Sequence, residues 1–320
     1  MLIKGKEIIN SHYTVSVVIC CNTINRLDWI IETVSSLQKQ SRPPEEVIVI
    51  FDRVEGLGES LHRRLPTFVK IIANSSNSGL SLARNTGISS SSSDIVAFLD
   101  DDATAESDWL KYLIAPFDDP QVIGTGGKAV PHWLGSGNRP FWFPEEIDWV
   151  VGCMHIGFGD GQKIVRNVFG CNMCFRKQQI NEVGGFDFRL GGSIAGDDTD
   201  FCLRISRGDK LRQIIYEPKA IIHHKVPIKR QSFRYVAYST WKQGIGKAVT
   251  ERIHQNDERA LSSEKSYIKL LLLKFFPSQL RRFFKHPIST IGQTITVVIV
   301  IASFGVGYTM TRMRLVKIRC

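Results

Sequence analysis

Three consecutive carboxylates, Asp100 to Asp102, directly follow a short apolar run in this chain of 320 residues. The run, Ile95–Leu99, is too short for a helix and is flanked by polar residues, which predicts a strand buried in a parallel sheet. The carboxylates then lie just beyond the carboxyl end of that strand, where open α/β sheets bind ligands. Because three like charges repel one another, the cluster favours a divalent cation such as Mg²⁺ or Mn²⁺, which also binds nucleotide phosphates. The alternative is a solvated acidic turn in which Asp102 or Thr104 caps a following helix.

The residues before this run alternate between strand and helix patterns. Three more apolar runs, at 15–20, 46–51 and 69–72, predict strands, and a helix between the first two is indicated by the spacing of Ile30, Ile31, Val34 and Leu37. Such alternation predicts an α/β fold in which helices cover a parallel sheet. The strand ends meet at one edge of that sheet, where we expect Thr23, Asp52, Asn74 and the three acids from Asp100 to Asp102.

Four stretches carry a resemblance to a known family. They are VSVVICCNTINR, EEVIVIFDR, GLSLARNTGI followed by IVAFLDDDA, and GGFD with GDDTDF. Through them the chain resembles glycosyltransferase family 2 over about residues 15–226. The resemblance implies a GT-A fold, which is a Rossmann-like, mostly parallel central sheet with flanking helices. It also implies inverting transfer of a sugar from a nucleotide-sugar donor. The second stretch departs from the family, because many members continue with Asp-Asp-Gly-Ser where this chain has Phe51-Asp52-Arg53-Val54.

The resemblance assigns donor contacts to five residues. Thr23 lies in the first loop, which in the family touches the nucleobase, and Asp52 matches the acid that contacts the uracil or ribose. Arg84 matches a basic residue near the diphosphate. Asp100 and Asp102 match the two ends of the family's Asp-x-Asp motif, and we expect Asp100 and the intervening Asp101 on the donor side of the site.

The resemblance also implies a metal site and a general base. Asp102 would contact Mn²⁺ or Mg²⁺, and His224 matches a histidine that can ligate the same metal. The rival interpretation of His224 is a polar strand end, which is the favoured interpretation for His223. Asp198 matches the general base, and Asp197 stands beside it where the family usually has Glu.

The same chemistry follows from the residues themselves. Displacement at an anomeric carbon needs a departing diphosphate whose charge is neutralised, which a metal ion does. It also needs a carboxylate that takes the proton of the acceptor hydroxyl on the opposite face, as inverting glycosidases do for water. The two acid groups, about a hundred residues apart in the chain, suit these two tasks.

Cysteines and aromatic residues have plainer interpretations. Cys171 and Cys174 form a Cys-x-x-Cys spacing, but no second close pair completes a zinc site, and we favour a buried strand beside the acceptor. Seven cysteines without a framework indicate a reducing compartment. In the aromatic stretch at 141–149 we favour packing for Trp149, whereas packing and an acceptor platform both stay open for Trp142.

Charge is divided unevenly along the chain. Residues 225–320 hold 18 Lys and Arg against 4 Asp and Glu, a net charge of +14, whereas the rest of the chain has a net charge of −4. Such a basic tail points to nucleic acid or anionic lipid. No module that mixes aromatic and basic residues supports nucleic acid, so we expect membrane lipids as partner.

The tail also contains a long apolar segment. Residues 288–310 are uncharged, and these 23 residues can cross a bilayer with modest tilt. Upstream, apolar residues mix with cations at 270–276 and 281–285, as in an interfacial segment. The alternative is a buried soluble helix hairpin. We expect a cell-membrane protein with a cytoplasmic catalytic domain, because the upstream flank is more basic and nucleotide sugars are cytoplasmic.

These expectations divide the chain into four parts. They are an N-terminal extension at 1–12, a GT-A domain at 13–230, a basic, helical, interfacial segment at 231–286, and a candidate transmembrane helix with a basic C-terminus at 287–320. The tail serves as a single-pass or interfacial anchor.

The expected activity is metal-dependent inverting glycosyl transfer. A basic and apolar tail favours a hydroxyl acceptor that sits in the membrane, such as a polyprenyl- or dolichyl-phosphate-linked glycan. The stretches FWFPEEIDWVVGC and GCNMCFRK are similar to archaeal-type glucuronosyltransferases acting on dolichyl-phosphate-linked glycans. By resemblance the donor is a UDP-sugar, with UDP-glucuronate as one option. The alternatives are transfer to surface polysaccharide or protein, and a non-catalytic protein that binds nucleotide sugars.

Overall fold

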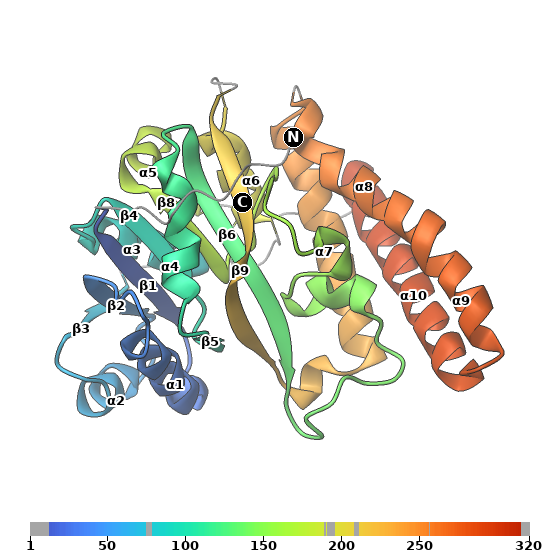
Figure 1. The fold of residues 1–320 in the computed structure, drawn as a ribbon, viewed down its shortest axis with the longest axis horizontal. Coiled ribbons are helices and arrows are strands. Elements are labelled where there is room, and N and C mark those ends of the chain that lie inside the picture. The colour runs from blue at the N-terminus through green and yellow to red at the C-terminus, as the bar shows by residue number, and fades with distance from the viewer. Residues whose placement is uncertain are drawn as a thin grey trace.

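A nine-stranded mixed sheet forms the centre of the molecule (Figure 1). The computed structural model describes residues 13–74, 79–188, 190, 196–207, 211–255 and 257–314. Eight strands follow the order β3-β2-β1-β4-β8-β6-β9-β5, and β7 pairs with β9. Their bounds are β1 Val15–Cys21, β2 Glu46–Phe51, β3 Val69–Ala73, β4 Ile95–Leu99, β5 Ala103–Ala105, β6 Val122–Trp133, β7 Lys163–Ile164, β8 Asn172–Arg176 and β9 Gln213–Val226.

The first half of the sheet is parallel and the second half is mixed. Strands β1 to β4 pair in parallel, and this confirms the strands predicted from the first four apolar runs. β8 then joins β4 and β6 as an antiparallel strand, whereas β6 and β9 run parallel to each other. The second half therefore departs from a purely parallel sheet while keeping the predicted α/β class.

Helices cover both faces of the sheet (Figure 1). The α-helices of this part are α1 Leu27–Gln38, α2 Leu57–Arg64, α3 Leu80–Ser90, α4 Trp109–Ile114, α5 Lys177–Val183 and α6 Asp197–Ile205. Strand side chains alternate between two apolar clusters, so Val17 and Ile19 pack on the side of α1 and α4. Val18 points to the other face and packs with residues of α3 and α6.

The C-terminal helices pack on the end of this domain. They are α7 Phe233–Ile253, α8 Ser262–Leu270, the π-helical turn η7 Leu271–Phe275, α9 Phe276–Phe283 and α10 Pro287–Arg312. The short 3₁₀ segments are η1 Ile24–Arg26, η2 Ala115–Asp118, η3 Glu145–Val151, η4 Ile156–Phe158, η5 Ile228–Arg230 and η6 Glu258–Leu261. A third apolar cluster joins Phe143 and Val226 to Phe275 and Val300, so it crosses the expected boundary between residues 230 and 231.

Helices α7 and α10 approach each other closely. A Cβ atom on Gly244 would overlap the carbonyl oxygen of Phe304, and one on Gly307 would overlap that of Trp241. Glycine at both positions therefore allows backbone-to-backbone packing. The aromatic stretch closes the other end of α10, where Trp142 stacks on Phe233 with ring centroids 4.2 Å apart.

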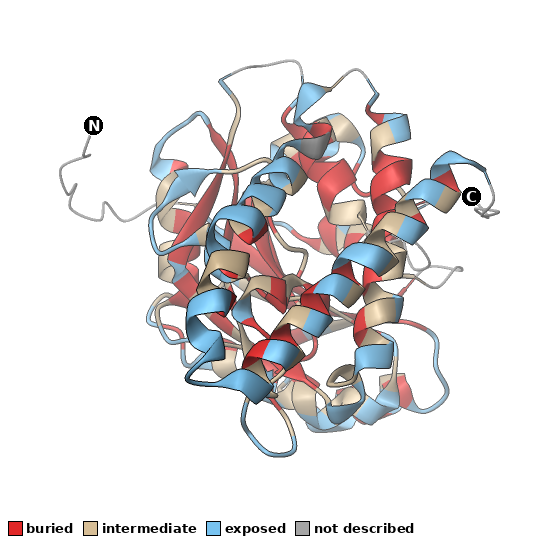
Figure 2. Cartoon of the chain, turned by 90° about the vertical axis from the view of Figure 1, so that its right-hand side faces the viewer, coloured by how far each residue is buried: buried red, intermediate tan, exposed pale blue. Residues whose placement is uncertain are grey.

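Helix α10 is long and apolar enough to span a membrane by length and composition. One side of it is packed against the protein, and the opposite side is exposed together with the outer sides of α8, η7 and α9 (Figure 2). We call this surface the C-terminal apolar face, and its members are Ile268, Leu272, Leu273, Leu280, Phe284, Ile288, Ile291, Ile295, Val298, Ile301 and Val306. The expected N-terminal extension at 1–12 and the last residues, 315–320, lie outside the described part of the chain.

Candidate active site

The carboxylates after β4 meet a histidine from β9. Strand β4 ends at Leu99, and the short strand β5 pairs antiparallel with β9 so that Ala103 lies opposite His224. This register brings the imidazole Nε2 of His224 to 3.1 Å from the carboxylate of Asp102. Ligand atoms of Asp100, Asp102 and His224 all lie within 4.8 Å of one another. Two carboxylates and an imidazole at this spacing suit a divalent cation such as Mn²⁺ or Mg²⁺.

The alternative of a helix-capping turn is wrong. Asp102 precedes β5 and Thr104 lies within it, so neither residue caps a helix. The next helix, α4, begins at Trp109 with Asp108 at its N-cap.

Cations surround the acid cluster. Arg26 contacts the carboxylates of Asp101 at 2.6 Å and Asp102 at 3.2 Å, and Arg230 lies 3.6 Å from Asp102. Burial opposes the charged form of Asp102, but His224 and the two arginines outweigh it and lower the pKa of Asp102. Burial also opposes the charged form of His224, and Asp102 outweighs it, raising the pKa of His224 to about 10. Burial raises the pKa of Asp101 to about 7 despite the contact with Arg26.

The second acid group begins helix α6. The carboxylate of Asp198 accepts hydrogen bonds from the backbone N–H groups of Thr199 at 2.7 Å and Gly170 at 3.3 Å. Burial, reinforced by the neighbouring charge of Asp197, raises the pKa of Asp198. A carboxylate with a raised pKa is a better proton acceptor than an exposed one.

Arg84 links the two acid groups. Its guanidinium, buried on α3, donates to the carboxylate of Asp197 at 2.9 Å and lies 3.9 Å from that of Asp100. Arg84 belongs to the stretch GLSLARNTGI and reaches both groups because α3 packs against β1 and β2. The arginine therefore sits between the candidate metal ligands and the candidate base.

One cavity of about 790 Å³ contains both groups. Asp100, Asp102 and His224 line it together with Asp197, Asp198 and Arg84, so residues nearly a hundred positions apart face the same space. The cavity continues between the C-terminal helices, where apolar side chains of η7 and α10 form its walls. Such a cavity can hold a charged ligand at one end and an apolar one at the other.

The remaining sequence-predicted residues lie beside the cavity. Thr23, Asp52 and Asp101 are described residues that stand outside its lining. Cys21 pairs with Phe51 in the register of β1 and β2, so the loops that carry Thr23 and Asp52 start from neighbouring strand ends. Asp52 is buried and accepts a hydrogen bond from Asn74 at 2.8 Å.

Several lining residues were missed in the sequence. Arg26 and Arg230 contact Asp102, one of the candidate metal ligands, and Arg166, Lys247 and Glu264 also line the cavity. Helix α7 carries a polar stripe at four-residue spacing, and its members Tyr235, Ser239, Gln243 and Lys247 all line the cavity. That spacing is readable in the sequence, but the stripe's partner surface is not.

Trp149 packs against the third apolar cluster, as predicted, and its indole is also part of the cavity lining. The indole meets the ring of Tyr267 edge to face, with centroids 5.8 Å apart. Cys174 is buried in strand β8 as predicted, with its thiol 2.9 Å from the Thr125 hydroxyl, whereas Cys171 lies just before the strand and lines the cavity. Burial raises the pKa of the Cys174 thiol to about 12, so the thiol stays neutral.

The fold and the acid groups define a sugar-transferring α/β enzyme. The family model "Glycosyl transferase family 2" matches residues 16–182. The chain belongs to this family. A curated relative is the glucosyl-dolichyl phosphate glucuronosyltransferase of Haloferax volcanii, 32% identical over 92% of this chain and 95% of the relative. Another is the succinoglycan biosynthesis protein ExoM of Rhizobium meliloti, 28% identical over 78% of this chain and 82% of the relative.

A solved structure confirms the GT-A fold. The mannosyltransferase PcManGT from Pyrobaculum calidifontis, determined with GDP-Man and Mn²⁺, superposes with a TM-score of 0.61. The alignment covers 94% of this chain and 88% of that one at 16% sequence identity. The protein is therefore a family 2 glycosyltransferase with a GT-A fold and a C-terminal helix apolar enough to enter a membrane.

Proposed function

We propose that this enzyme transfers a sugar, with inversion, from a nucleotide-sugar donor to a hydroxyl of a lipid-linked acceptor, and that the reaction depends on Mn²⁺ or Mg²⁺. The observation that carries the proposal is the continuity of the cavity. Its acidic end contains Asp100, Asp102 and Asp198, and its other end is walled by apolar residues of the C-terminal helices.

The donor occupies the acidic end. Asp100, Asp102 and His224 would supply the oxygen and nitrogen ligands of the metal, which when bound would neutralise the charge on the departing diphosphate. Arg84 and Arg26 face the same region and add positive charge. Thr23 and Asp52 follow neighbouring strand ends, and we assign them to the base and ribose by family resemblance. We assign UDP as the nucleotide by family resemblance.

Asp198 acts as the general base. Its carboxylate faces the cavity and is fixed by two backbone N–H groups, and its raised pKa suits removal of a proton from an acceptor hydroxyl. Asp197 positions Arg84 through their 2.9 Å ion pair. Attack from the side of Asp198, opposite the diphosphate, inverts the anomeric carbon.

The acceptor arrives from the membrane. Ile268 and Leu272 belong both to the cavity wall and to the C-terminal apolar face, so a lipid chain can pass from the bilayer into the cavity. The relative from Haloferax volcanii is named for a glucosyl-dolichyl phosphate acceptor and a glucuronosyl group, which supports a polyprenyl-phosphate-linked glycan and UDP-glucuronate here.

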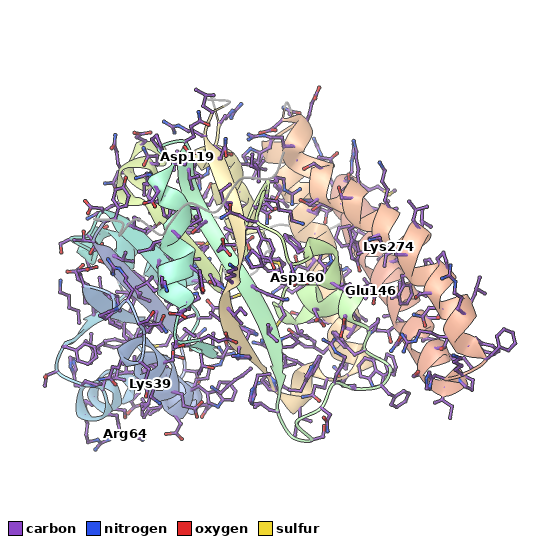
Figure 3. All side chains as sticks on the ribbon, viewed as in Figure 1. Lys39, Arg64, Asp119, Glu146, Asp160 and Lys274 are labelled. Carbon is purple, nitrogen blue, oxygen red and sulfur yellow. The ribbon has the colours of Figure 1, made fainter. Side chains whose placement is uncertain are left out.

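Helix α10 lies in the membrane surface and does not cross it. Both ends of α10 are held by the rest of the protein. Thr296 donates to the carbonyl of Trp142 at 2.8 Å, and Arg252 of α7 donates to the carbonyl of Thr311 at 3.1 Å. The helix that packs on it, α7, carries Lys242 and Glu251, which cannot enter hydrocarbon cheaply. Exposed cations of the C-terminal helices, such as Lys274 in η7 (Figure 3), suit contact with anionic lipid headgroups. The active site then faces the cytoplasm, where nucleotide sugars are present.

A second function is transfer to surface polysaccharide, which the relative from Rhizobium meliloti favours by its name. A non-catalytic nucleotide-sugar-binding protein is disfavoured, since Asp100, Asp102 and Asp198 all line the cavity. Nucleic acid is not expected as a partner.

The test uses the purified full chain in detergent. UDP release and product formation are measured with a panel of UDP-sugars, including UDP-glucuronate, and with a short prenyl-phosphate-linked glucose as acceptor. We expect transfer with Mn²⁺ or Mg²⁺ and none with EDTA. Asp198→Asn should abolish transfer while donor binding stays within a few-fold. Full activity in EDTA, or an active Asp198→Asn enzyme, contradicts the proposal.

A further inference from the structure

Two buried cations share one carboxylate in the middle of the cavity. Arg166 contacts Glu264 in a bidentate manner, at 2.8 and 3.2 Å, and Lys247 pairs with the same carboxylate. The side chains of Arg166 and Lys247 are only 6% and 9% exposed, whereas Glu264 is 28% exposed. All three line the cavity. Arg166 also donates to the carbonyl of Ala260 at 2.7 Å and to the side-chain oxygen of Asn167 at 2.9 Å, which satisfies hydrogen bonds without adding negative charge. One negative charge therefore balances two buried positive charges.

The position of this cluster is set by two helices. Lys247 ends the polar stripe of α7, and a Cβ atom on Gly196, just before the acids of α6, would lie 3.8 Å from the carbonyl oxygen of Gly246, so this turn of α7 lies close to the start of α6. On α8 and η7 the lining runs from Glu264 through Ile268 to Leu272, which covers about 12 Å of helix. Along that stretch the wall changes from charged to apolar, and Ile268 and Leu272 are exposed at the surface.

We infer that Arg166 and Lys247 bind the phosphate group of the lipid-linked acceptor, and that Glu264 occupies this subsite until the phosphate replaces it. The inference rests on the proposed function and assigns its acceptor subsite. The phosphodiester of such an acceptor offers the guanidinium two oxygens in the forked geometry that Glu264 also uses, with the same single negative charge, and it brings with it a hydrocarbon chain that can bind along Ile268 and Leu272. The hydrocarbon then leaves along Ile268 and Leu272 toward the C-terminal apolar face, and the sugar points to Asp198.

This subsite is separate from that of the donor diphosphate. The donor cations Arg84 and Arg26 contact Asp197, Asp101 and Asp102, whereas Arg166 and Lys247 contact Glu264. Burial and the nearby charge of Arg166 lower the pKa of Lys247 to about 8 even with Glu264 beside it, so a second anionic partner would stabilise its charged form.

The test measures binding of farnesyl phosphate and of farnesol to the full chain in detergent by calorimetry. We expect farnesyl phosphate to bind at least about tenfold more tightly than farnesol, because its phosphate can form hydrogen bonds with the two charged side chains. Lys247→Met and Arg166→Gln should each remove most of this preference without changing the affinity for farnesol. Glu264→Gln should act in the opposite direction and tighten farnesyl phosphate binding, because the competing carboxylate is gone.

Controls separate this subsite from other sites. Arg212 forms a similar ion pair with Glu182, at 2.8 Å and outside the cavity lining. Arg212→Gln breaks that pair and should leave the preference for farnesyl phosphate over farnesol unchanged. If Lys247→Met does not fold, Lys247→Arg should keep the preference and Glu264→Gln should still raise it. The inference would be overturned by a preference for farnesyl phosphate that survives in Arg166→Gln and does not rise in Glu264→Gln.

Competition identifies the source of the phosphate and the subsite. Millimolar inorganic phosphate should displace farnesyl phosphate poorly, and displacement equal to that by unlabelled farnesyl phosphate contradicts a lipid-borne group. UDP with Mn²⁺ should leave binding unchanged, and displacement by UDP would place the phosphate in the donor site. Since these measurements need no sugar transfer, they can succeed where the transfer assay fails, and the two proposals are tested separately.

Discussion

At the scale of single residues, Asp198 is tuned by its neighbours. Burial raises its pKa, the charge of Asp197 raises it further, and Arg84 opposes both. If Asp198 is the base, activity disappears as pH falls through this pKa, because the protonated carboxyl cannot accept a proton. The acidic limb of the kcat/KM profile should therefore lie above the ordinary aspartate value of about 3.9.

Asp197→Asn tests the origin of that shift. The substitution removes a neighbouring negative charge and frees Arg84 from its ion pair, and both effects favour ionised Asp198. The acidic limb should move to lower pH, even if the maximal rate falls. Asp160→Asn removes an exposed carboxylate outside the cavity and should leave the limb in place. A limb that stays or moves upward in Asp197→Asn contradicts the role of Asp198.

His224 and His223 offer a matched pair for the metal site. Successive residues of β9 point to opposite sides, so His224 reaches Asp102 whereas His223 pairs with exposed Glu106 at 3.0 Å. His224→Ala should weaken Mn²⁺ binding in the presence of UDP by about tenfold or more, as loss of a nitrogen ligand implies. Titration calorimetry measures this Mn²⁺ affinity. His223→Ala should bind Mn²⁺ as tightly as the parent protein does. Equal affinities in both variants would remove His224 from the metal site.

At the scale of elements, the α7–α10 contact depends on two glycines. A Cβ atom at position 307 would overlap the backbone of Trp241, whereas one at position 305 meets nothing within 4 Å. Gly307→Ala should therefore cost about 1–3 kcal/mol in the free energy of unfolding, since packed backbones must separate. Gly305→Ala, in the same helix, should be neutral or stabilising by up to about 1 kcal/mol. Thermal unfolding in detergent compares them, and equal destabilisation would mean that the contact does not require glycine.

Elements of the first half of the sheet were predictable because their signals are local. Each apolar run from Val15 to Leu99 is a complete strand, and the acids after Leu99 follow from its end. The antiparallel insertion of β8 between β4 and β6 was not predictable from periodicity, because Cys174 and Phe175 are apolar in either direction of pairing. His224 could be matched only through the family resemblance, and its partner follows from the pairing of β5 with β9.

The cavity's far end was beyond the reach of sequence patterns. Arg166 and Glu264 are separated by 98 residues and come from a loop and a helix, so no spacing rule joins them. The apolar character of α10 was evident, but its one-sided burial was not. Thr296 and Gln293 interrupt the apolar run because they donate hydrogen bonds to the carbonyls of Trp142 and Phe141.

At the scale of the whole molecule, the catalytic part and the C-terminal helices pack together (Figures 1 and 2), and the C-terminal apolar face lies on the outer side of these helices. Deleting residues after 287 would remove Val297 and Val300 from the third apolar cluster and open one wall of the cavity. The tail is therefore part of the packed protein, and in the proposed function the same helices contact the membrane, where their basic charge would attract anionic lipid.

An enzyme seated on the bilayer in this way keeps both ends of α10 on the same side. His286 and Met313 flank the helix and are exposed, so His286→Cys and Met313→Cys should both react with a membrane-impermeant maleimide on sealed vesicles. Lys39→Cys, at the end of α1 far from the helices, defines the side of the catalytic part, and the parent chain gives the labelling of native cysteines (Figure 3). A spanning helix, about 39 Å long, would place one of the two ends across the bilayer. If the cysteine at position 286 or 313 is labelled only after the vesicles are opened, α10 crosses the membrane and does not keep its contact with α7.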